Sequence, residues 1–173
     1  RRKGERKRIL EKVMKREAHI LIGTQMVSKG YDIPDINTAV ILNADSVINI
    51  PDIRSEERFM QMLVQTAGRA GRRDERGKIL VEIGPSGIHL KDFIENLDYL
   101  KFIGEELLRR ESHGFPPYRR MLRIMHKNRE KDKALENLYE IYEELQKRRG
   151  KRVKILPPGF HYVEKVNNLY RAE

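Results

Sequence analysis

Residues 61–73 read Gln-Met-Leu-Val-Gln-Thr-Ala-Gly-Arg-Ala-Gly-Arg-Arg, a run in which apolar, glycine and arginine residues alternate. On a helix of about 100° per residue, the apolar side chains in and just before this run share one side: Phe59, Met60, Leu63, Val64 and Ala67. The opposite side carries the polar and cationic residues, which are Gln61, Gln65, Arg69 and Arg72. The spacing predicts an amphipathic helix with one side in a core.

Two glycines, Gly68 and Gly71, lie between these two sides. A glycine in a helix interior costs about 1 kcal/mol relative to alanine, so each needs a reason. They can cap the end of the helix, which leaves the neighbouring arginines solvated. They can instead let a ligand come close to the backbone, with Arg69 and Arg72 binding phosphate oxygens as bidentate guanidinium forks. The residues themselves leave both interpretations open.

Residues 65–72 resemble motif VI of superfamily two helicases, whose pattern is Gln-x-x-Gly-Arg-x-Gly-Arg. Residues 22–34, Ile-Gly-Thr-Gln-Met-Val-Ser-Lys-Gly-Tyr-Asp-Ile-Pro, resemble motif V of the same proteins at the expected distance upstream. The connecting residues 43–45 and 51–58 resemble the replication-restart helicases of this superfamily, and these segments together cover most of residues 1–84. Two motifs in order with matching connections are far more specific than one Gly-Arg-x-Gly-Arg.

This resemblance implies roles for individual residues. By this resemblance, we expect Arg69 and Arg72 to be the catalytic arginine fingers. We expect Gln65, Gly68 and Asp32 to bind ATP, and Gly23, Thr24, Gln25 and Lys29 to bind DNA. Thr24 suits strand contact because its hydroxyl and backbone N–H can both donate to a phosphate.

Two of these residues have a simpler explanation, and one neighbouring position departs from the family pattern. Asp32 can be a turn residue leading into Ile33 and Pro34, and Lys29 beside a glycine can be a solvated surface lysine. The replication-restart family usually has histidine where this chain has Tyr31, so any role of that histidine does not carry over.

Short apolar runs alternate with helical segments in the first half of the chain. The runs at 19–22, 38–42 and 78–83 predict buried parallel strands, and the alternation predicts an α/β layer with right-handed crossovers. The resemblance makes this a RecA-like second helicase lobe over residues 1–84. Ligand-binding loops of such sheets lie at the carboxyl ends of the strands, so we expect Thr24 and Arg69 at one exposed edge.

The turn at residues 84–87 ends this alternation. Apolar residues at helical spacing from Leu90 to Leu107 predict a helical linker over 85–118. A strand at 121–125, a helix with Leu135, Leu138, Tyr142 and Leu145 on one side, and a strand at 153–156 predict a small domain. The resemblance makes residues 119–173 part of a C-terminal α+β, ferredoxin-like domain that touches DNA.

The chain of 173 residues has a formal net charge of +10, which favours an anionic partner such as nucleic acid. A thermophile-like charged surface would explain the 36% of charged residues, but not the excess of positive charge. Cysteine is absent and the five histidines lack metal-ligand spacing, so no metal site is expected. No apolar run reaches the length of a membrane span and no signal peptide is visible, so we expect no membrane partner and a cytoplasmic protein.

Neither a phosphate-binding Gly-x-x-x-x-Gly-Lys-Ser/Thr loop nor an Asp-Glu-x-His box is present. We therefore expect a fragment of a longer parent, which would bind ATP and magnesium and carry its zinc module elsewhere. The resemblance implies these partners: forked and single-stranded DNA, the first helicase lobe of the same chain, and single-strand-binding and primosome proteins. Two alternatives remain, a stand-alone basic nucleic-acid-binding module with a chance motif and another motor such as a branch-migration helicase.

Overall fold

The computed structural model describes residues 4–24, 36–70 and 77–173. The chain forms two compact units, Arg1–His113 (unit 1) and Gly114–Glu173 (unit 2). The elements of unit 1 are α1 (Glu5–Met14), β1 (Thr38–Ile41), α3 (Asp45–Ile48), α4 (Ser55–Ala67), β2 (Lys78–Val81), the 3-10 helix η1 (Pro85–Leu90), α5 (Lys91–Asn96) and α6 (Tyr99–His113).

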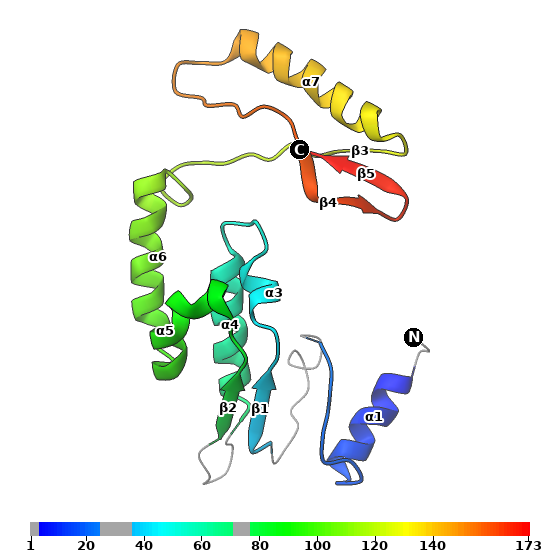
Figure 1. Cartoon of the computed structure of the whole chain (residues 1–173), viewed down its shortest axis with the longest axis vertical. Helices are drawn as coiled ribbons and strands as arrows, with labels where there is room; N and C mark the ends of the chain where they lie inside the picture. Colours follow the sequence, from blue (N-terminus) through cyan, green and yellow to red (C-terminus); the bar gives the residue numbers. More distant parts are fainter. Residues whose placement is uncertain (1–3, 25–35, 71–76) are drawn as a thin grey trace. The chain divides into compact units, whose positions relative to one another are not determined.

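Strands β1 and β2 pair in parallel, from Thr38 opposite Lys78 to Ile41 opposite Val81. Parallel neighbours need a crossover, and α3 and α4 supply it between the two strands. Figure 1 shows α4 running back along the strand pair. The predicted α/β class of this part of the chain is therefore confirmed, as are the strands expected near 38–42 and 78–83.

The core of unit 1 forms around α4. Phe59, Met60 and Leu63 are fully buried, as the apolar stripe predicts, whereas Val64 at the end of that stripe is 39% exposed. Leu90 of η1, Phe93 of α5 and Phe102 of α6 belong to the same buried cluster. The rings of Phe93 and Phe102 meet edge to face with their centroids 5.7 Å apart, a favoured aromatic arrangement.

The change in packing comes at Gly114 and not at the turn of residues 84–87. The segment expected to be a linker contributes three buried side chains to the core of unit 1, so residues 85–113 pack as part of that unit. Gly114 has a φ of +67°, which a glycine adopts without cost at a helix end. The division into functional domains at 84 and 118 stays a prediction.

The single helix expected from Leu90 to Leu107 is interrupted. Leu97 has a φ of +50°, and α6 begins just after it. The Asp98 carboxylate accepts a hydrogen bond from the Lys101 backbone N–H at 3.0 Å, which is the contact of a helix N-cap. Apolar spacing runs through this break because both helices present their apolar sides to one core.

The strand predicted at 19–22 is wrong. These residues lie outside any strand in the described part of the chain, and Ile20 and Ile22 are 80% and 88% exposed. A short apolar run favours a buried strand only where a neighbouring strand pairs with it, and none of the described segments does so here.

Unit 2 contains β3 (His126–Asn128), α7 (Lys131–Arg148), β4 (Phe160–Val166) and β5 (Leu169–Ala172). The strands form an antiparallel sheet in the order β3-β5-β4. Ala134 and Leu138 of α7 are buried with Ala172 of β5, so the predicted apolar side of this helix does pack on the sheet. A small α+β arrangement is confirmed.

Two strands predicted in unit 2 are also wrong. Segments 121–125 and 153–156 are unpaired, and Leu122 and Leu156 are 89% and 70% exposed. The sheet is instead completed by a hairpin that the sequence analysis did not include. Asn167 and Asn168 connect its strands with φ of +50° and +62°, values that asparagine tolerates better than most residues.

The burial of Phe59 gives a first testable prediction. Phe59→Ala is expected to lower the free energy of unfolding of unit 1 by about 3–5 kcal/mol, because it removes a buried ring and leaves a cavity. Urea unfolding followed by circular dichroism measures this. Val64→Ala on the same helix is the matched control and should cost about 0.5 kcal/mol. Equal losses in the two variants would contradict the packing described here.

Candidate nucleotide and nucleic-acid site

Helix α4 ends at Ala67, immediately before the two arginines of the motif. Gly68 is its C-cap, and its N–H donates to the Val64 carbonyl at 3.0 Å. The Arg69 N–H donates to the Thr66 carbonyl at 3.1 Å in the turn that follows. The prediction of one helix through Arg73 is wrong for Arg69, because α4 ends at Ala67 and Arg69 lies in the turn that follows. Arg69 therefore lies beyond the end of α4 and not on its polar side.

Space does not require a glycine at position 68. A Cβ added there would lie 3.6 Å from the Val64 carbonyl oxygen and 3.9 Å from that of Gln65, which are ordinary contacts. Its φ of −64° is open to every residue type. Gly68 therefore does not adopt the left-handed conformation that a glycine cap supplies, and the close approach of a ligand stays a prediction.

The predicted site residues fall into two groups. Gln65, Gly68, Gly23 and Thr24 are exposed, and Arg69 is half-buried. The other four predicted residues lie outside the described residues: Gln25, Lys29, Asp32 and Arg72. Neither Thr24 nor Arg69 is in the apolar core. Burial of either side chain there would have contradicted its proposed contact with a ligand.

The expectation that Thr24 and Arg69 share an edge of the sheet stays a prediction, and its reason changes. Because α4 connects two parallel strands, its last turn returns toward the amino end of β2 (Figure 1). Arg69 therefore lies toward the opposite end of the strand pair from the loop after β1. The rule about carboxyl-end loops applies to that loop and not to Arg69.

The loop after β1 is tied to the loop after β2 by Asp45. Its carboxylate accepts hydrogen bonds from the backbone N–H groups of Gly84 and Gly87, the latter at 3.0 Å. A Cβ at Gly84 would lie only 2.9 Å from the Asp45 Oδ2 atom, so a larger residue there would displace this carboxylate. The segment 43–45, part of the helicase resemblance, thus has a structural function at the carboxyl ends of the strands.

An ionic cluster joins α4 to α6, and we call it the α4–α6 cluster. Its members are Glu56, Glu57, Glu106, Arg109 and Arg110. Arg110 donates through Nε to Glu106 Oε1 at 2.6 Å and through Nη2 to Glu57 Oε2 at 2.9 Å and the Ile53 carbonyl at 3.1 Å. Arg109 bonds Glu106 and reaches Glu56 Oε2 at 2.5 Å. Arg110 and Glu106 are buried, so each carries its charge beside an opposite one.

The pKa values of both arginines follow from this cluster. Burial disfavours their charge, but hydrogen bonds to the glutamates outweigh burial and raise the pKa of Arg109 and of Arg110. A raised pKa means that the stability contributed by a cation is present below its unfolded value and is lost only above it. The cluster therefore keeps its positive charges throughout the physiological pH range.

The polar side of α4 also contacts α6 one turn further along. The Gln61 amide nitrogen donates to Glu57 Oε1 at 2.9 Å and lies 3.4 Å from the Tyr99 hydroxyl of α6. Sequence analysis placed Gln61 on the polar side of the helix, and it missed this neighbour. The only sequence signal for the α4–α6 cluster was the pair Arg109-Arg110 at the end of an amphipathic helix.

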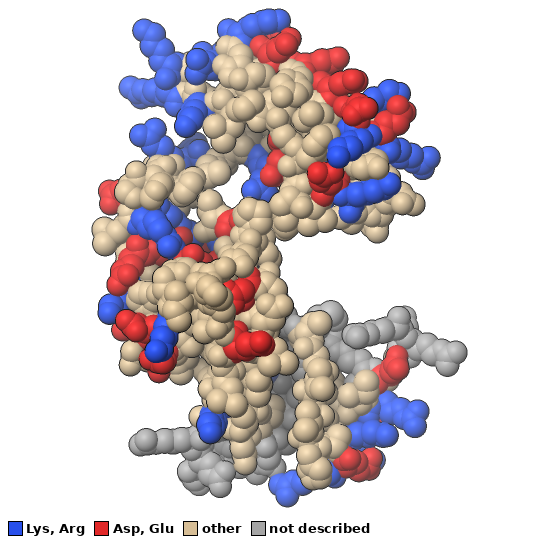
Figure 2. All heavy atoms as spheres, in the orientation of Figure 1, with Lys and Arg blue, Asp and Glu red and all other residues tan. Residues whose placement is uncertain are grey.

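A cationic segment of unit 2 spans the last two residues of α7 and the residues after it, and we call residues 147–154 the basic loop. All of its residues are exposed, none is acidic, and six are cationic: Lys147, Arg148, Arg149, Lys151, Arg152 and Lys154. Figure 2 shows Lys and Arg atoms gathered at one end of this unit, while acidic and basic atoms are mixed over the rest. Glu144 pairs with Lys147 and Arg148, at 3.6 and 2.6 Å. The remaining cations extend the positive surface beyond the helix.

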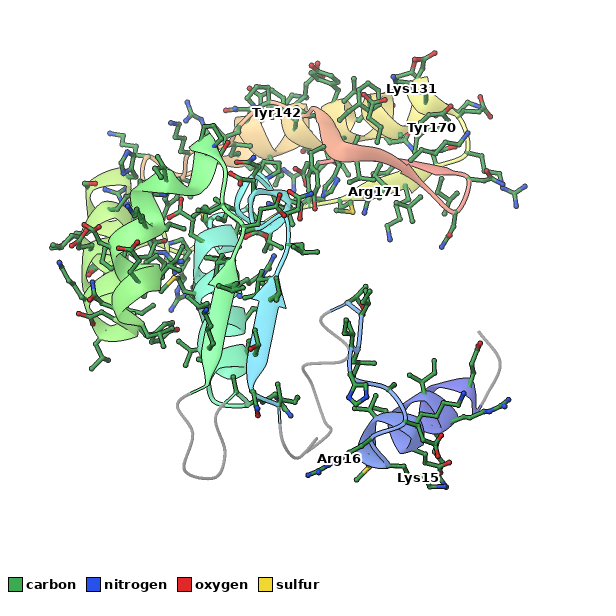
Figure 3. All side chains as sticks on the ribbon, turned by 60° about the horizontal axis from the view of Figure 1, so that its bottom comes forward. Lys15, Arg16, Lys131, Tyr142, Tyr170 and Arg171 are labelled. Atoms are coloured by element: carbon green, nitrogen blue, oxygen red, sulfur yellow. The ribbon has the colours of Figure 1, made fainter. Side chains whose placement is uncertain are left out.

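Other cations of unit 2 are used within the fold. Lys131, at the start of α7 in Figure 3, pairs with Glu164 at 2.8 Å and lies 4.7 Å from the centre of the Phe160 ring. Arg171 on β5 donates through Nε and Nη2 to the Val163 carbonyl, at 3.0 and 2.8 Å. These contacts set them apart from Lys151, Arg152 and Lys154 of the basic loop, which are exposed and extend beyond the helix.

Within the described ranges, no group of three or more histidine, aspartate and glutamate side chains could hold a metal ion. No helix in that same part of the chain is long and apolar enough to cross a membrane.

Comparison with known families agrees with the first unit's topology and its motif. Residues 1–74 match the family described as "Helicase conserved C-terminal domain", so this part of the chain is similar to that domain. The chain as a whole is similar to the replication restart protein PriA of several bacteria. The protein from Bacillus subtilis is 31% identical over 172 residues, the one from Synechocystis 34% over 174, and the one from Thermotoga maritima 32% over 162.

These matches cover 99%, 99% and 94% of this chain. In each case they cover 21% of the relative, so the chain spans about a fifth of the length of the curated relatives it matches. The resemblance to superfamily two helicases and to the replication-restart proteins is thus confirmed, with both units included.

Proposed function

We propose that this chain is the C-terminal part of an ATP-dependent DNA helicase that remodels forked DNA and restarts stalled replication forks. The carrying observation is that similarity to PriA extends over both units and is not confined to residues 1–74. A stand-alone basic module with a chance motif would not require collinear similarity through the α/β unit. A branch-migration motor would share the helicase lobe but gives no reason for the match to continue through unit 2.

We propose that Arg69 and Arg72 act as arginine fingers and that Gln65, Gly68 and Asp32 lie close to ATP. Support comes from the end of α4, where Gln65 and Gly68 are exposed and Arg69 follows the cap. A guanidinium stabilises the charge that spreads over the γ-phosphoryl oxygens in the transition state, and this is worth about 10³–10⁵ in rate. ATP supplies the transferred phosphoryl group.

The described residues fit the phosphate edge of a nucleotide better than they fit its metal. They offer a cation, Arg69, and the exposed side-chain amide of Gln65 but no group of carboxylates for magnesium. We therefore propose that a first helicase lobe, carrying the phosphate loop, holds ATP with its magnesium. The zinc of the proposed parent protein would lie outside this chain.

For DNA, we propose contacts of Gly23, Thr24, Gln25 and Lys29 with the phosphates of one strand. The basic loop would bind further phosphates without reading bases. Closure of the lobes on ATP and reopening after hydrolysis would move the strand contacts along DNA. Forked and single-stranded DNA, single-strand-binding protein and primosome proteins are the proposed partners, and replicating DNA places the protein in the cytoplasm.

A chimera tests this function. The matching fifth of Bacillus subtilis PriA is replaced by this chain, and ATP hydrolysis is measured with and without forked DNA. We expect hydrolysis that forked DNA stimulates. A folded chimera that binds DNA but never hydrolyses ATP would instead support the stand-alone binding module.

The isolated 173-residue chain is expected to hydrolyse no ATP above background, since no phosphate loop is present. A malachite-green phosphate assay with and without DNA measures this, and the active chimera is its positive control. Turnover that copurifies with the chain through two different columns would contradict the proposal.

A further inference from the structure

We propose that α6 positions the arginines of motif VI, with Glu57, Arg110 and Tyr99 as positioning residues. This inference rests on the proposed function, because it assigns α6 a part in placing the arginine fingers. None of these three residues would touch the nucleotide. They would act through α4, whose last turn leads directly into the motif.

The contacts lie on the side of α4 that leads to the site. Glu57, Gln61 and Gln65 follow one another at one-turn spacing, so they share one side of the helix. Glu57 bonds Arg110, and Gln61 lies beside both Glu57 and the Tyr99 hydroxyl. Gln65 is next along that side, followed by the cap at Gly68. The α6 contacts therefore hold the same polar side that ends at the proposed nucleotide residues.

The cluster is built to hold α4 in one position. Arg110 is buried and bonds two glutamates and a backbone carbonyl, so most of its directional donors have partners with fixed geometry. The opposite side of α4 is packed in the core through Phe59, Met60 and Leu63. A helix held on both sides moves as a rigid rod, and a displacement at its first turn also displaces its last.

Glu57→Gln is the sharpest probe of this inference. The carboxylate accepts one hydrogen bond on each oxygen, from Gln61 and from Arg110. An amide has one acceptor oxygen, so one of these two donors loses its partner. Arg110 keeps Glu106 and the Ile53 carbonyl, which protects the fold. Glu95→Gln is the matched control, because Glu95 forms an exposed pair with Lys91 within α5 and none with α4.

The first experiment measures position without any enzymatic activity. The chain has no native cysteine, so spin labels can be placed through Ala70→Cys and Leu100→Cys in the 173-residue chain. Pulsed dipolar spectroscopy then gives the distribution of distances between α6 and the turn after α4. We expect Glu57→Gln to shift or broaden it, and Glu95→Gln to leave it unchanged. An unchanged distribution in Glu57→Gln would overturn the inference.

The second experiment uses the chimera and separates positioning from general stability. Glu57→Gln is expected to lower kcat for ATP about tenfold, as a small misplacement of catalytic groups does, with KM, DNA affinity and Tm close to the parent values. In an Arg72→Ala background it should lower kcat no further, since a residue acting through the arginine has nothing left to position. Tyr99→Phe, which keeps the ring, should give a smaller loss of the same kind.

The outcomes distinguish this inference from the proposed function. An inactive parent chimera would contradict the function, while the spin-label distances would still support or overturn positioning by α6. A Glu57→Gln loss that multiplies with that of Arg72→Ala, or a fall in Tm without a fall in kcat, would show a purely structural role and overturn the inference.

Discussion

Replacing Arg72 by alanine in the chimera is expected to lower the turnover of ATP by about 10³-fold or more. The guanidinium would meet negative charge mainly in the transition state, when the γ-phosphoryl oxygens carry it, so its loss should reduce kcat and leave nucleotide affinity almost unchanged. DNA affinity and the folded state should also stay close to those of the parent. Steady-state ATP hydrolysis, filter binding to single-stranded DNA and circular dichroism measure the three quantities.

Two variants sharpen this prediction. Arg72→Lys should lose nearly as much turnover, because a point charge does not replace a bidentate fork. Thr24→Ala should show the opposite emphasis, with weaker DNA contact and weaker stimulation by DNA but little change in nucleotide binding. Full turnover in Arg72→Ala would rule out the arginine-finger role. Full turnover in Arg72→Lys would show that a positive charge is sufficient at this position and that the bidentate geometry is not needed.

The features of unit 1 that could be predicted from the sequence are those in which local pattern and packing agree. The runs at 38–42 and 78–83 are apolar, and they do pair as β1 and β2. The stripe led by Phe59 and Leu63 is buried because α4 lies on a core. Both features need only the period of the apolar residues, which is local information.

The failed predictions have a common physical cause, which is that a local pattern does not reveal partners or helix ends. Segment 19–22 has strand composition but no strand partner in the described structure, and segment 121–125 repeats this in unit 2. Helix α4 stops at Gly68 although the polar pattern continues to Arg72. Where the same apolar periodicity continues on both sides of a helix break, the sequence pattern does not reveal the break. Leu97 is such a case.

Of the candidate site, the motifs identified the residues but not their supports. The contacts between Arg110 and Glu57, and between Arg109 and Glu56, join residues 53 positions apart. No spacing rule links such positions, because they meet only after α4 and α6 pack together. Similarly, Asp45 is part of a recognised segment, but its bonds to Gly84 and Gly87 depend on the two strands being neighbours.

The second large effect is expected at the basic loop. The variant with Arg149, Lys151, Arg152 and Lys154 all replaced by glutamine should bind single-stranded DNA about 10²-fold more weakly at low salt. These four cations are exposed and lie beyond the pairs that Glu144 forms at the end of α7. Binding by the unmodified chain should be weak, strongly dependent on salt and nearly independent of base sequence, since it rests on phosphates.

The salt dependence decides whether these cations act by phosphate contact. The slope of log K against log salt is negative, and each lost contact to a single strand should make it less negative by about 0.7. Four lost contacts should therefore change it by about 3. The control variant replaces Arg58, Lys91, Lys131 and Lys133 by glutamine, which removes the same formal charge from cations already paired with carboxylates outside the basic loop. Fluorescence anisotropy of labelled DNA at several salt concentrations measures both slopes. If the basic loop contacts phosphates, the slope should change more in the loop variant than in the control. Equal slope changes in the two variants would show that net charge alone attracts DNA.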